Sequence, residues 1–342
     1  MVLVVGSMNL DRIARVHRAP GPGETVPIDT VALAAGGKGG NVAAAAARLG
    51  ARVCMVARVG ADTDGEVLRT ALADAGVDVD AVQATADAPT GTALIWVDAE
   101  GENRIGVLAG ANATLSPSVI DALAAPQDLF ARAGRIVLNL EIPLASVRHA
   151  LARAHGAGVP TIVNLSPIAP LSLAHLGTGD TVVVNAAEAG QLLDEAPPTD
   201  LAAAVRCAAA LCRRGPGTAV VTLGAGGVAA SAPDGEHRLA AVPVEPVDTT
   251  GAGDAFLGAL AAGLDAGLDL GAALRVAAAA GAFTATRQGA QAAQPTRPQL
   301  ERWARHRGLA LPAWGDGRAG AASPAGDAAP RPRAGRGRRA GR

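Results

Sequence analysis

The chain has 342 residues, a formal net charge of -1, 49% apolar residues and only 2% aromatic residues. This length and apolar content predict a folded protein with a sizeable core, and the scarcity of rings argues against a surface that stacks single-stranded nucleic acid. No segment has the length and hydropathy of a membrane-spanning helix, and the apolar run at residues 2–5 is too short for a signal peptide. The three cysteines form no C-x-x-C pair, so we expect neither a disulfide scaffold nor a zinc site, and a reducing, cytoplasmic location.

Short runs rich in Val, Ile and Leu alternate along the chain with Ala-rich segments of helical periodicity. We predict strands at residues 2–5, 53–57, 136–140, 161–164, 181–184 and 219–223. We predict helices at residues 41–49, 65–75, 144–155, 201–213, 254–264 and 271–286. This alternation is typical of an α/β fold with a doubly wound, mostly parallel sheet flanked by helices. In such sheets, ligands bind at the carboxyl ends of the strands.

Two segments, at about 12–35 and 90–108, interrupt the alternation. The first has strand-like residues broken by prolines, and the second reads as a hairpin with its turn at 99–102. Because neither leads into a crossover helix, they predict a small antiparallel β lid beside the main sheet. Exposed sheets of this kind often serve as lids or dimer contacts, so we expect a homodimer formed through the lid.

The composition changes at the C-terminal end. Residues 312–342 are rich in Gly, Ala, Pro and Arg, and residues 315–342 contain seven Arg and two Asp. Such a segment cannot bury enough apolar surface to order itself, so we predict a globular domain at 1–311 and a disordered tail at 312–342. A basic tail can also contact nucleic acid, but no aromatic residues are interleaved with these arginines, and we do not expect nucleic acid as a partner.

The most informative stretch is Asp-Thr-Thr-Gly-Ala-Gly-Asp at residues 248–254. It follows a predicted strand ending at Val247 and opens a predicted helix. Gly251 and Gly253 allow the amides of residues 251–253 to converge on an oxyanion at the helix N-terminus, and Asp254 in the first turn can accept a proton. The alternative is a glycine-rich helix entry with an acidic residue and no further role.

A second glycine-rich stretch, Gly-Gly-Lys-Gly-Gly-Asn, occupies residues 36–41 and precedes another predicted helix. Its glycines let the backbone approach a small polar ligand, and Lys38, the only lysine of the chain, and Asn41 supply directed polar groups. The common phosphate motifs are absent: Gly39 follows the lysine where a Walker A loop needs Ser or Thr, and Phe256 takes the third glycine position of a dinucleotide fingerprint.

Together these stretches resemble the two signatures of the ribokinase (PfkB) family of carbohydrate kinases. Residues 36–50 are similar to the first signature and residues 248–256 to the second, and the likeness extends over about residues 1–305, with Asn-Ala-Ala-Glu at 185–188 among the matching motifs. The resemblance implies a ribokinase-like fold and transfer of the γ-phosphoryl group of ATP to the 5-hydroxyl of D-ribose.

The resemblance also implies roles for individual residues. Asp254 matches the catalytic base, and the anion hole matches Gly251, Ala252 and Gly253. The sugar-contacting positions, besides Asp254, are Asn9, Asp11, Gly37, Lys38, Gly39, Gly40, Asn41 and Glu141. The nucleotide-binding positions, besides Gly253 and Asp254, are Asn185, Thr222, Leu223, Gly224, Ala225, Gly226 and Gly227.

The same resemblance implies binding sites for two cations. Asn185 and Glu188 match the motif that organises Mg²⁺, largely through water. The positions that match K⁺ ligands are Asp248, Thr250, Thr284, Arg287, Gly289 and Ala293. The chain departs from the family at Ala293, where Ser is usual, and at Ala278, where His or Asn often lies near the adenine. These departures leave the strength of K⁺ activation and the base selectivity open.

The residues leave more than one function open. Another sugar or nucleoside kinase of the family would act on deoxyribose, fructose, pseudouridine or adenosine instead of ribose. A sugar-binding protein without turnover is a further alternative, against which the intact Asp254 and glycine loop argue.

Overall fold

The computed structural model describes residues 1–315 and contains a ten-stranded main sheet. Its spatial order is β14 (Gly235–Leu239), β13 (Val228–Ala232), β12 (Thr218–Thr222), β11 (Thr181–Asn185), β10 (Thr161–Asn164), β9 (Arg135–Asn139), β1 (Val2–Val5), β4 (Val53–Gly60) and β5 (Val77–Asp78), with β6 (Val82–Thr85) also pairing with β4. All pairs are parallel except β12 with β13 and β13 with β14. The α/β prediction is confirmed, and its six strands form the central parallel part of the sheet.

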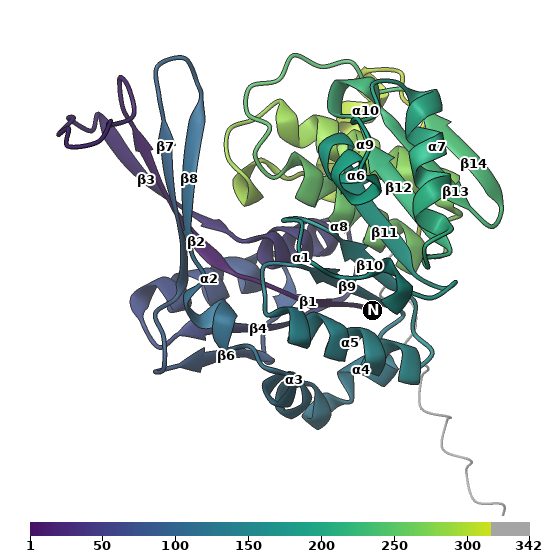
Figure 1. Ribbon diagram of the computed structural model, residues 1–342, viewed down its shortest axis with the longest axis horizontal. Helices are drawn as coiled ribbons and strands as arrows, with labels where there is room; N and C mark the ends of the chain where they lie inside the picture. The colour runs from purple at the N-terminus through teal and green to yellow at the C-terminus, as the bar shows by residue number, and fades with distance from the viewer. Residues whose placement is uncertain (316–342) are drawn as a thin grey trace, which may run out of the picture.

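Helices cover both faces of this sheet (Figure 1). They are α1 (Lys38–Arg48), α2 (Thr63–Asp74), α3 (Pro117–Ala124), α4 (Leu129–Arg132), α5 (Leu144–Gly156), α6 (Ala186–Leu193), α7 (Leu201–Cys212), α8 (Ala252–Asp265), α9 (Leu270–Ala285) and α10 (Arg297–His306). Strand side chains alternate between two cores: Val2 and Val4 pack with α1, α8 and α9, whereas Leu3 and Val5 pack with α5 and α7. The six predicted helices are present, each with ends within three residues of the prediction.

Close packing of α1 against α8 places the two glycine-rich stretches side by side. A Cβ on Gly258 would lie 2.6 Å from Ala45 Cβ and 2.7 Å from the Val42 carbonyl oxygen. Only glycine therefore fits at this helix crossing, where the backbones approach closely. Because both helices run from the carboxyl edge of the sheet, their first turns, which carry the predicted site residues, lie near each other.

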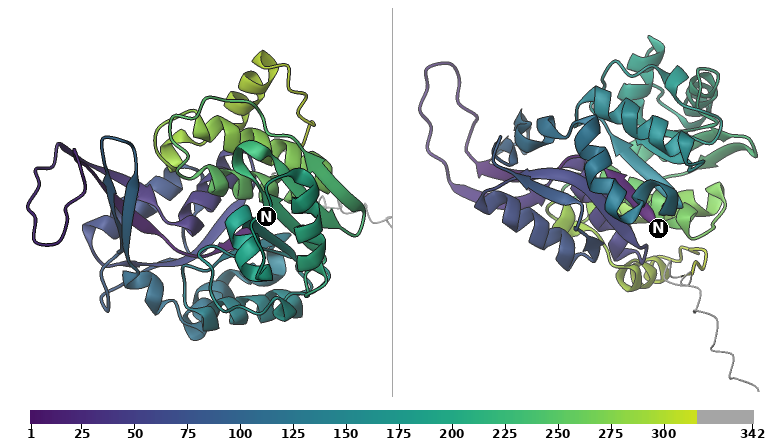
Figure 2. Two further views of the ribbon diagram at one scale, coloured as in Figure 1. Left: turned by 45° about the horizontal axis from the view of Figure 1, so that its top comes forward. Right: turned by 90° about the horizontal axis from the view of Figure 1, so that it is seen from below.

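The lid is a separate four-stranded sheet that projects from the main body (Figures 1 and 2). Its order is β3 (Thr30–Gly36), β2 (Asn9–Arg15), β7 (Gly91–Val97) and β8 (Asn103–Leu108). The outer pairs are antiparallel, as predicted, but the central pair of β2 and β7 is parallel because the chain passes through the main domain between them. The hairpin turn falls at 98–102, where the Glu102 amide donates to Asp98 Oδ1 at 2.8 Å.

The lid exposes an unusual amount of apolar surface. Its side chains with half or more of their surface exposed are Val31, Leu33, Leu94, Ile105, Val107 and Leu108. Large contiguous apolar patches on the surface of a folded protein usually mark interaction sites.

The packed part of the chain extends beyond residue 311, where the predicted domain ends. Trp314 is only 7% exposed, belongs to the core under α1, and donates its indole N–H to the Leu49 carbonyl at 3.4 Å. The remainder of the predicted tail, 316–342, lies outside the described residues. Within residues 1–315, no helix has the length and apolar character needed to cross a membrane.

Candidate active site

Hydrogen bonds to the carboxylate of Asp248 hold the turn at 248–254 in its conformation. No strand leads into it: β14 ends at Leu239, so the strand predicted to end at Val247 is wrong, because residues 240–247 run as an irregular connection. Asp248 accepts hydrogen bonds from the amides of Thr250 and Gly289, both at 2.9 Å. Burial alone would raise the pKa of Asp248, but these hydrogen bonds outweigh it and hold the pKa below its ordinary value, so this carboxylate is ionised.

The predicted anion hole lies at the start of α8, where the first backbone amides have no intrahelical acceptor. Gly251 is in the left-handed region at φ 72, and a Cβ there would lie 2.9 Å from Ala290, so no other residue fits without strain. A Cβ on Gly253 would meet no atom within 4 Å, so the approach to this amide is open. The Ala252 amide donates within the turn to the Thr249 carbonyl at 3.2 Å.

Asp254 is buried beside the first turn of α1. It is 9% exposed, and Asn41, 6% exposed, donates Nδ2–H to Asp254 Oδ2 at 2.8 Å. Burial raises the pKa of Asp254, and the nearby Lys38 and the Asn41 hydrogen bond oppose that rise. Asn41 Oδ1 is buried with no hydrogen-bond partner within the described structure. This pair therefore presents a carboxylate and an unsatisfied acceptor at the same point.

The stretch at 36–41 forms the first turn of α1, because the helix begins at Lys38, three residues before the predicted start. The Lys38 amide donates to Glu141 Oε2 at 3.1 Å, and the Ser7 hydroxyl donates to the same oxygen at 2.6 Å. Gly37 has φ 83, and a Cβ on Gly39 would lie 2.7 Å from the Ser7 backbone. The glycines are required here for close contact with the chain that follows β1.

Asn9 and Asp11 lie on β2, two residues apart and on one face of the lid, as the sequence predicts. Asn112 holds Asn9 in place: its Nδ2 donates to Asn9 Oδ1 at 2.8 Å, and its Oδ1 accepts from the Met8 amide at 2.9 Å. Asn112 and Ser7 are positioning residues that the sequence analysis missed. No local pattern could indicate the role of Asn112, because its partners Met8 and Asn9 lie 104 and 103 residues away in the chain.

Three carboxylates meet on this side of the site. Asp11 is 8% exposed, and burial, followed by the charges of Glu141 and Asp254, raises its pKa to about 7. Both causes act in the same direction, because desolvation and nearby like charges each disfavour the ionised carboxylate. The structure thus brings the sugar-contacting candidates together: Asn9, Asp11, residues 37–41, Glu141 and Asp254.

The nucleotide-binding candidates lie further along the carboxyl edge of the sheet. Asn185 ends β11 and pairs in register with Thr222, which ends β12. Residues 222–227 then form a tight loop, in which the Leu223 amide donates to the Gly227 carbonyl at 2.8 Å and Gly227 has φ 101. Thr222, Leu223, Gly224, Ala225, Gly226 and Gly227 therefore lie together at the strand end where ligands of such sheets bind.

Asn185 and Glu188 form a capping box at the start of α6. The Asn185 amide donates to Glu188 Oε2 at 2.8 Å, and the Glu188 amide donates to Asn185 Oδ1 at 2.9 Å. Asn185 is exposed and Glu188 is half-buried. Glu188 uses only its Oε2 atom in the capping box, and a carboxylate beside an amide suits a Mg²⁺ ion that keeps most of its water.

The K⁺-ligand candidates come from two loops that the structure joins. Asp248 bonds to the Gly289 amide, and the amides of Val247 and Asp248 donate to the Ala285 carbonyl at 2.8 and 3.3 Å. This brings the segment with Asp248 and Thr250 against the one with Thr284, Arg287 and Gly289; Ala293 follows, buried at 2% exposure. No group of three or more His, Cys, Asp or Glu in residues 1–315 could hold a metal. A cation here would be held by backbone carbonyls beside the Asp248 carboxylate, and backbone carbonyl oxygens can replace the hydration shell of K⁺.

Known proteins resemble this chain over nearly its whole length. The ribokinase of Haemophilus influenzae is 34% identical over 303 residues, which cover 89% of this chain and 98% of that protein. The deoxyribokinase of Salmonella typhi is 33% identical, covering 88% and 98%. The structure of the Arabidopsis thaliana ribokinase complexed with ribose and ATP superimposes with a TM-score of 0.81 at 30% identity, covering 88% of this chain and 97% of the other.

The family profile described as pfkB family carbohydrate kinase matches residues 1–297, which include the lid, both glycine-rich turns and the nucleotide loop. Taken with the buried Asp254 at the start of α8, this match confirms the resemblance found in the sequence. The chain is a carbohydrate kinase and belongs to the pfkB family.

Proposed function

We propose that this enzyme transfers the γ-phosphoryl group of ATP to the 5-hydroxyl of D-ribose. The observation that carries the proposal is the buried Asp254 and Asn41 pair at the start of α8, beside the carboxylates of Asp11 and Glu141. The ribokinase relatives and the ribose and ATP complex of the Arabidopsis enzyme support ribose as the substrate.

Asp254 accepts the proton of the attacking hydroxyl. Its raised pKa brings it nearer to the working pH, and removal of the proton leaves a nucleophile facing the start of α8. The amides of Gly251, Ala252 and Gly253 then balance the negative charge that develops on the transferred phosphoryl group. Because the transition state of phosphoryl transfer is loose, positioning and charge stabilisation contribute more than strong basicity.

The sugar is recognised through its hydroxyl groups. Asp11 and Glu141 accept hydrogen bonds, the Lys38 ammonium donates, and the unpaired Asn41 Oδ1 takes up one further hydroxyl hydrogen. Asn9, fixed by Asn112, completes this set. A substrate that lacks a matching hydroxyl leaves one of these buried groups unpaired, at a cost of about 1–3 kcal/mol.

Two cations assist this chemistry. Asn185 and Glu188 hold Mg²⁺ largely through its water, and the ion supplies charge neutralisation for the ATP phosphates. Asp248 with the carbonyls of the adjoining loop holds K⁺ behind the α8 turn. Through the Gly289 amide, Asp248 already fixes the two loops against each other, so an ion there would stiffen the anion hole rather than touch the substrate.

The lid closes the sugar site and pairs with a second copy. Leu33 and Val107, two of its exposed apolar residues, are each about 60% exposed in one chain. An interface through this sheet would remove them from water. Leu33→Glu, expected to convert a dimer into a monomer in light scattering, tests this assembly; unchanged mass would contradict it. Cytoplasmic location stays a prediction.

The deciding experiment measures ADP release from ATP with ribose, 2-deoxyribose, fructose, pseudouridine and adenosine, with and without K⁺. We expect kcat/KM to be highest for ribose, and the phosphorus–proton coupling in the product to place the phosphate on C5. The deoxyribokinase relative makes 2-deoxyribose the second candidate. Equal kcat/KM for the two sugars would contradict ribose specificity, and binding of sugar without ADP release would contradict catalysis.

A further inference from the structure

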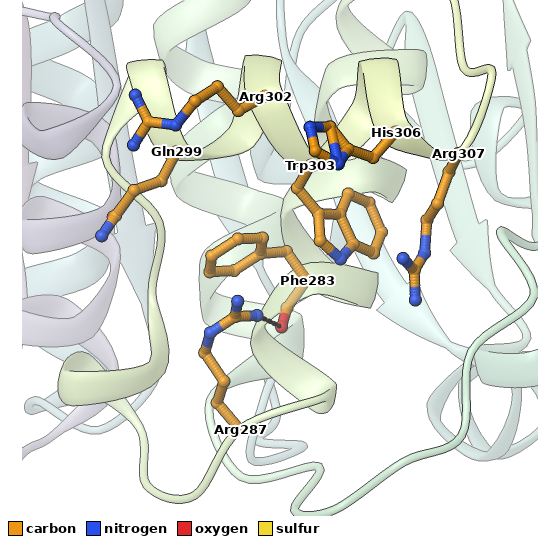
Figure 3. A pocket seen from close by; sticks show the side chains of 7 residues that line it. All are labelled: Phe283, Arg287, Gln299, Arg302, Trp303, His306 and Arg307. Atoms are coloured by element: carbon orange, nitrogen blue, oxygen red, sulfur yellow. Dashed lines mark hydrogen bonds between the residues drawn. The ribbon is translucent and has the colours of Figure 1, made fainter.

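A groove separate from the sugar and nucleotide loops lies between the end of α9 and α10. It is open to solvent and has a volume of about 370 Å³, within the usual range for small-molecule sites. Of its lining residues, Phe283 is buried and Trp303 half-buried, and the others are exposed. The lining side chains are Phe283, Arg287, Gln299, Arg302, Trp303, His306 and Arg307 (Figure 3).

The groove is strongly cationic and lacks an internal counter-charge. Three arginines and one histidine line it, and no Asp or Glu does. None of the ion pairs within residues 1–315 uses Arg287, Arg302 or Arg307. The like charges of Arg287 and Arg307, which both line the groove, repel each other. An anion between them would relieve that repulsion.

Aromatic rings hold two of the arginines in place. The Arg287 guanidinium lies 3.5 Å from the centroid of the Phe283 ring, and that of Arg307 lies 4.5 Å from the Trp303 ring. The two rings pack edge to face, 5.7 Å apart, which fixes the floor of the groove (Figure 3). Arg287 also donates to the Phe283 carbonyl at 3.0 Å. Less side-chain entropy is therefore lost when a ligand binds than with free surface arginines.

We propose that this groove binds a phosphorylated small molecule, with Arg287, Arg302 and Arg307 as the residues that supply its positive charge. A guanidinium fork matches two oxygens of a phosphate group at once, so each of these arginines can pair with phosphate oxygens of a ligand in the groove. Each ring already has a guanidinium over one face, so the groove offers more to a phosphate than to a stacked base. Its volume suits a single small ligand rather than a polymer.

The test is calorimetric titration of the full chain, in Mg²⁺-free buffer, with inorganic phosphate, pyrophosphate and ribose 5-phosphate. The double variant Arg302→Gln/Arg307→Gln is compared with Arg305→Gln, which removes one exposed arginine of α10 outside the groove. We expect the probe dissociation constants to rise at least tenfold in the double variant and to stay within twofold in the control. Tighter binding of ribose 5-phosphate than of inorganic phosphate identifies an organic ester as the ligand class; the reverse identifies the free anion.

Two results would overturn the proposal. Equal probe affinity in the wild type and the double variant, or no binding by the wild type, would mean that the groove is not the site. Tighter binding of a 20-nucleotide DNA strand than of ribose 5-phosphate, lost in the same variant, would assign the groove to nucleic acid. Because these titrations involve no turnover, they stand whether or not the enzyme phosphorylates ribose.

Discussion

The two halves of the active site are built in different ways. On the sugar side, contacts join residues far apart in the chain: Asn41 bonds to Asp254, and the Lys38 amide bonds to Glu141. On the nucleotide side, Asn185 and Glu188 bond to each other across three residues, and the loop at 222–227 closes on itself. Asp11, Asn41 and Asp254 on the sugar side are less than 10% exposed, whereas Asn185 is exposed and Glu188 is half-buried.

This difference follows from the cost of burying charge. A buried carboxylate needs fixed donors, as at Asp254, or takes up a proton more readily, as at Asp11, so the sugar side depends on the packing of α1, α8 and the lid together. An exposed capping box needs only its own helix. Substitutions on the sugar side should therefore affect both stability and sugar kinetics. Substitutions on the nucleotide side should change either stability or kinetics without changing the other.

The largest effect is expected at Asp254. Asp254→Asn should lower kcat by about 100- to 10,000-fold, because the hydroxyl proton loses its acceptor. The melting temperature should be unchanged or higher, since a neutral amide replaces a carboxylate whose burial raises its pKa. ADP release and thermal unfolding measure both. Asp234→Asn, in an exposed hairpin turn, is the control, and a kcat within tenfold of wild type would refute Asp254 as the base.

Asp11 should make the protein less stable as the pH rises. With a folded pKa of about 7, against the ordinary value of 3.8, the folded state holds a proton that the unfolded state releases between these values. Unfolding free energy should thus fall between pH 4.5 and 7.5, and Asp11→Asn should reduce this fall by about 3 kcal/mol. Urea unfolding at both pH values measures it; the same slope in variant and wild type would show that Asp11 ionises normally.

Gln294 makes a hydrogen bond that links a distant part of the chain to the sugar side of the site. It is 3% exposed and donates Nε2–H to the Asn41 carbonyl at 2.9 Å. Gln294→Met keeps the volume but removes the donor, so we expect a loss of about 1 kcal/mol in unfolding free energy together with a higher KM for the sugar. Gln288→Met, at an exposed position in the same segment, serves as the control. A loss of stability with an unchanged KM would show that the Gln294–Asn41 hydrogen bond stabilises the fold but does not affect sugar binding.

The smallest effect is expected at Glu188. Glu188→Gln keeps an oxygen for the Asn185 amide, so the melting temperature should not change. Loss of this partly exposed charge should raise the Mg²⁺ concentration for half-maximal activity by up to about fivefold, the range of an ionic contact near the surface. Asp200→Ala, which removes the cap of α7, should instead lower stability by about 1 kcal/mol without changing the Mg²⁺ response. If Glu188→Gln destabilises the protein and leaves the Mg²⁺ response unchanged, the Asn185–Glu188 capping box only stabilises the start of α6.

The parts predicted from the sequence are those with strong local signals. The central strands carry Val and Ile runs, and the two glycine-rich turns need backbone shapes that only glycine adopts, as at Gly37 and Gly251. Strands β13 and β14 escaped prediction because Val-Ala-Ala-Ser-Ala and Gly-Glu-His-Arg-Leu lack such runs. Asn112 escaped because its role depends on Asn9, 103 residues away.

The sequence by itself determined the alternating α/β order, the glycine-rich turns and the residue types at the phosphoryl-transfer site, because each is encoded within a few neighbouring residues. Only the tertiary structure decided that Asp11 has a pKa of about 7, that Trp314 belongs to the core, and that Arg287, which follows α9, shares one groove with Arg302 and Arg307 at α10. Burial and electrostatic coupling arise from segments that are remote in the chain, and they exist only once those segments have packed.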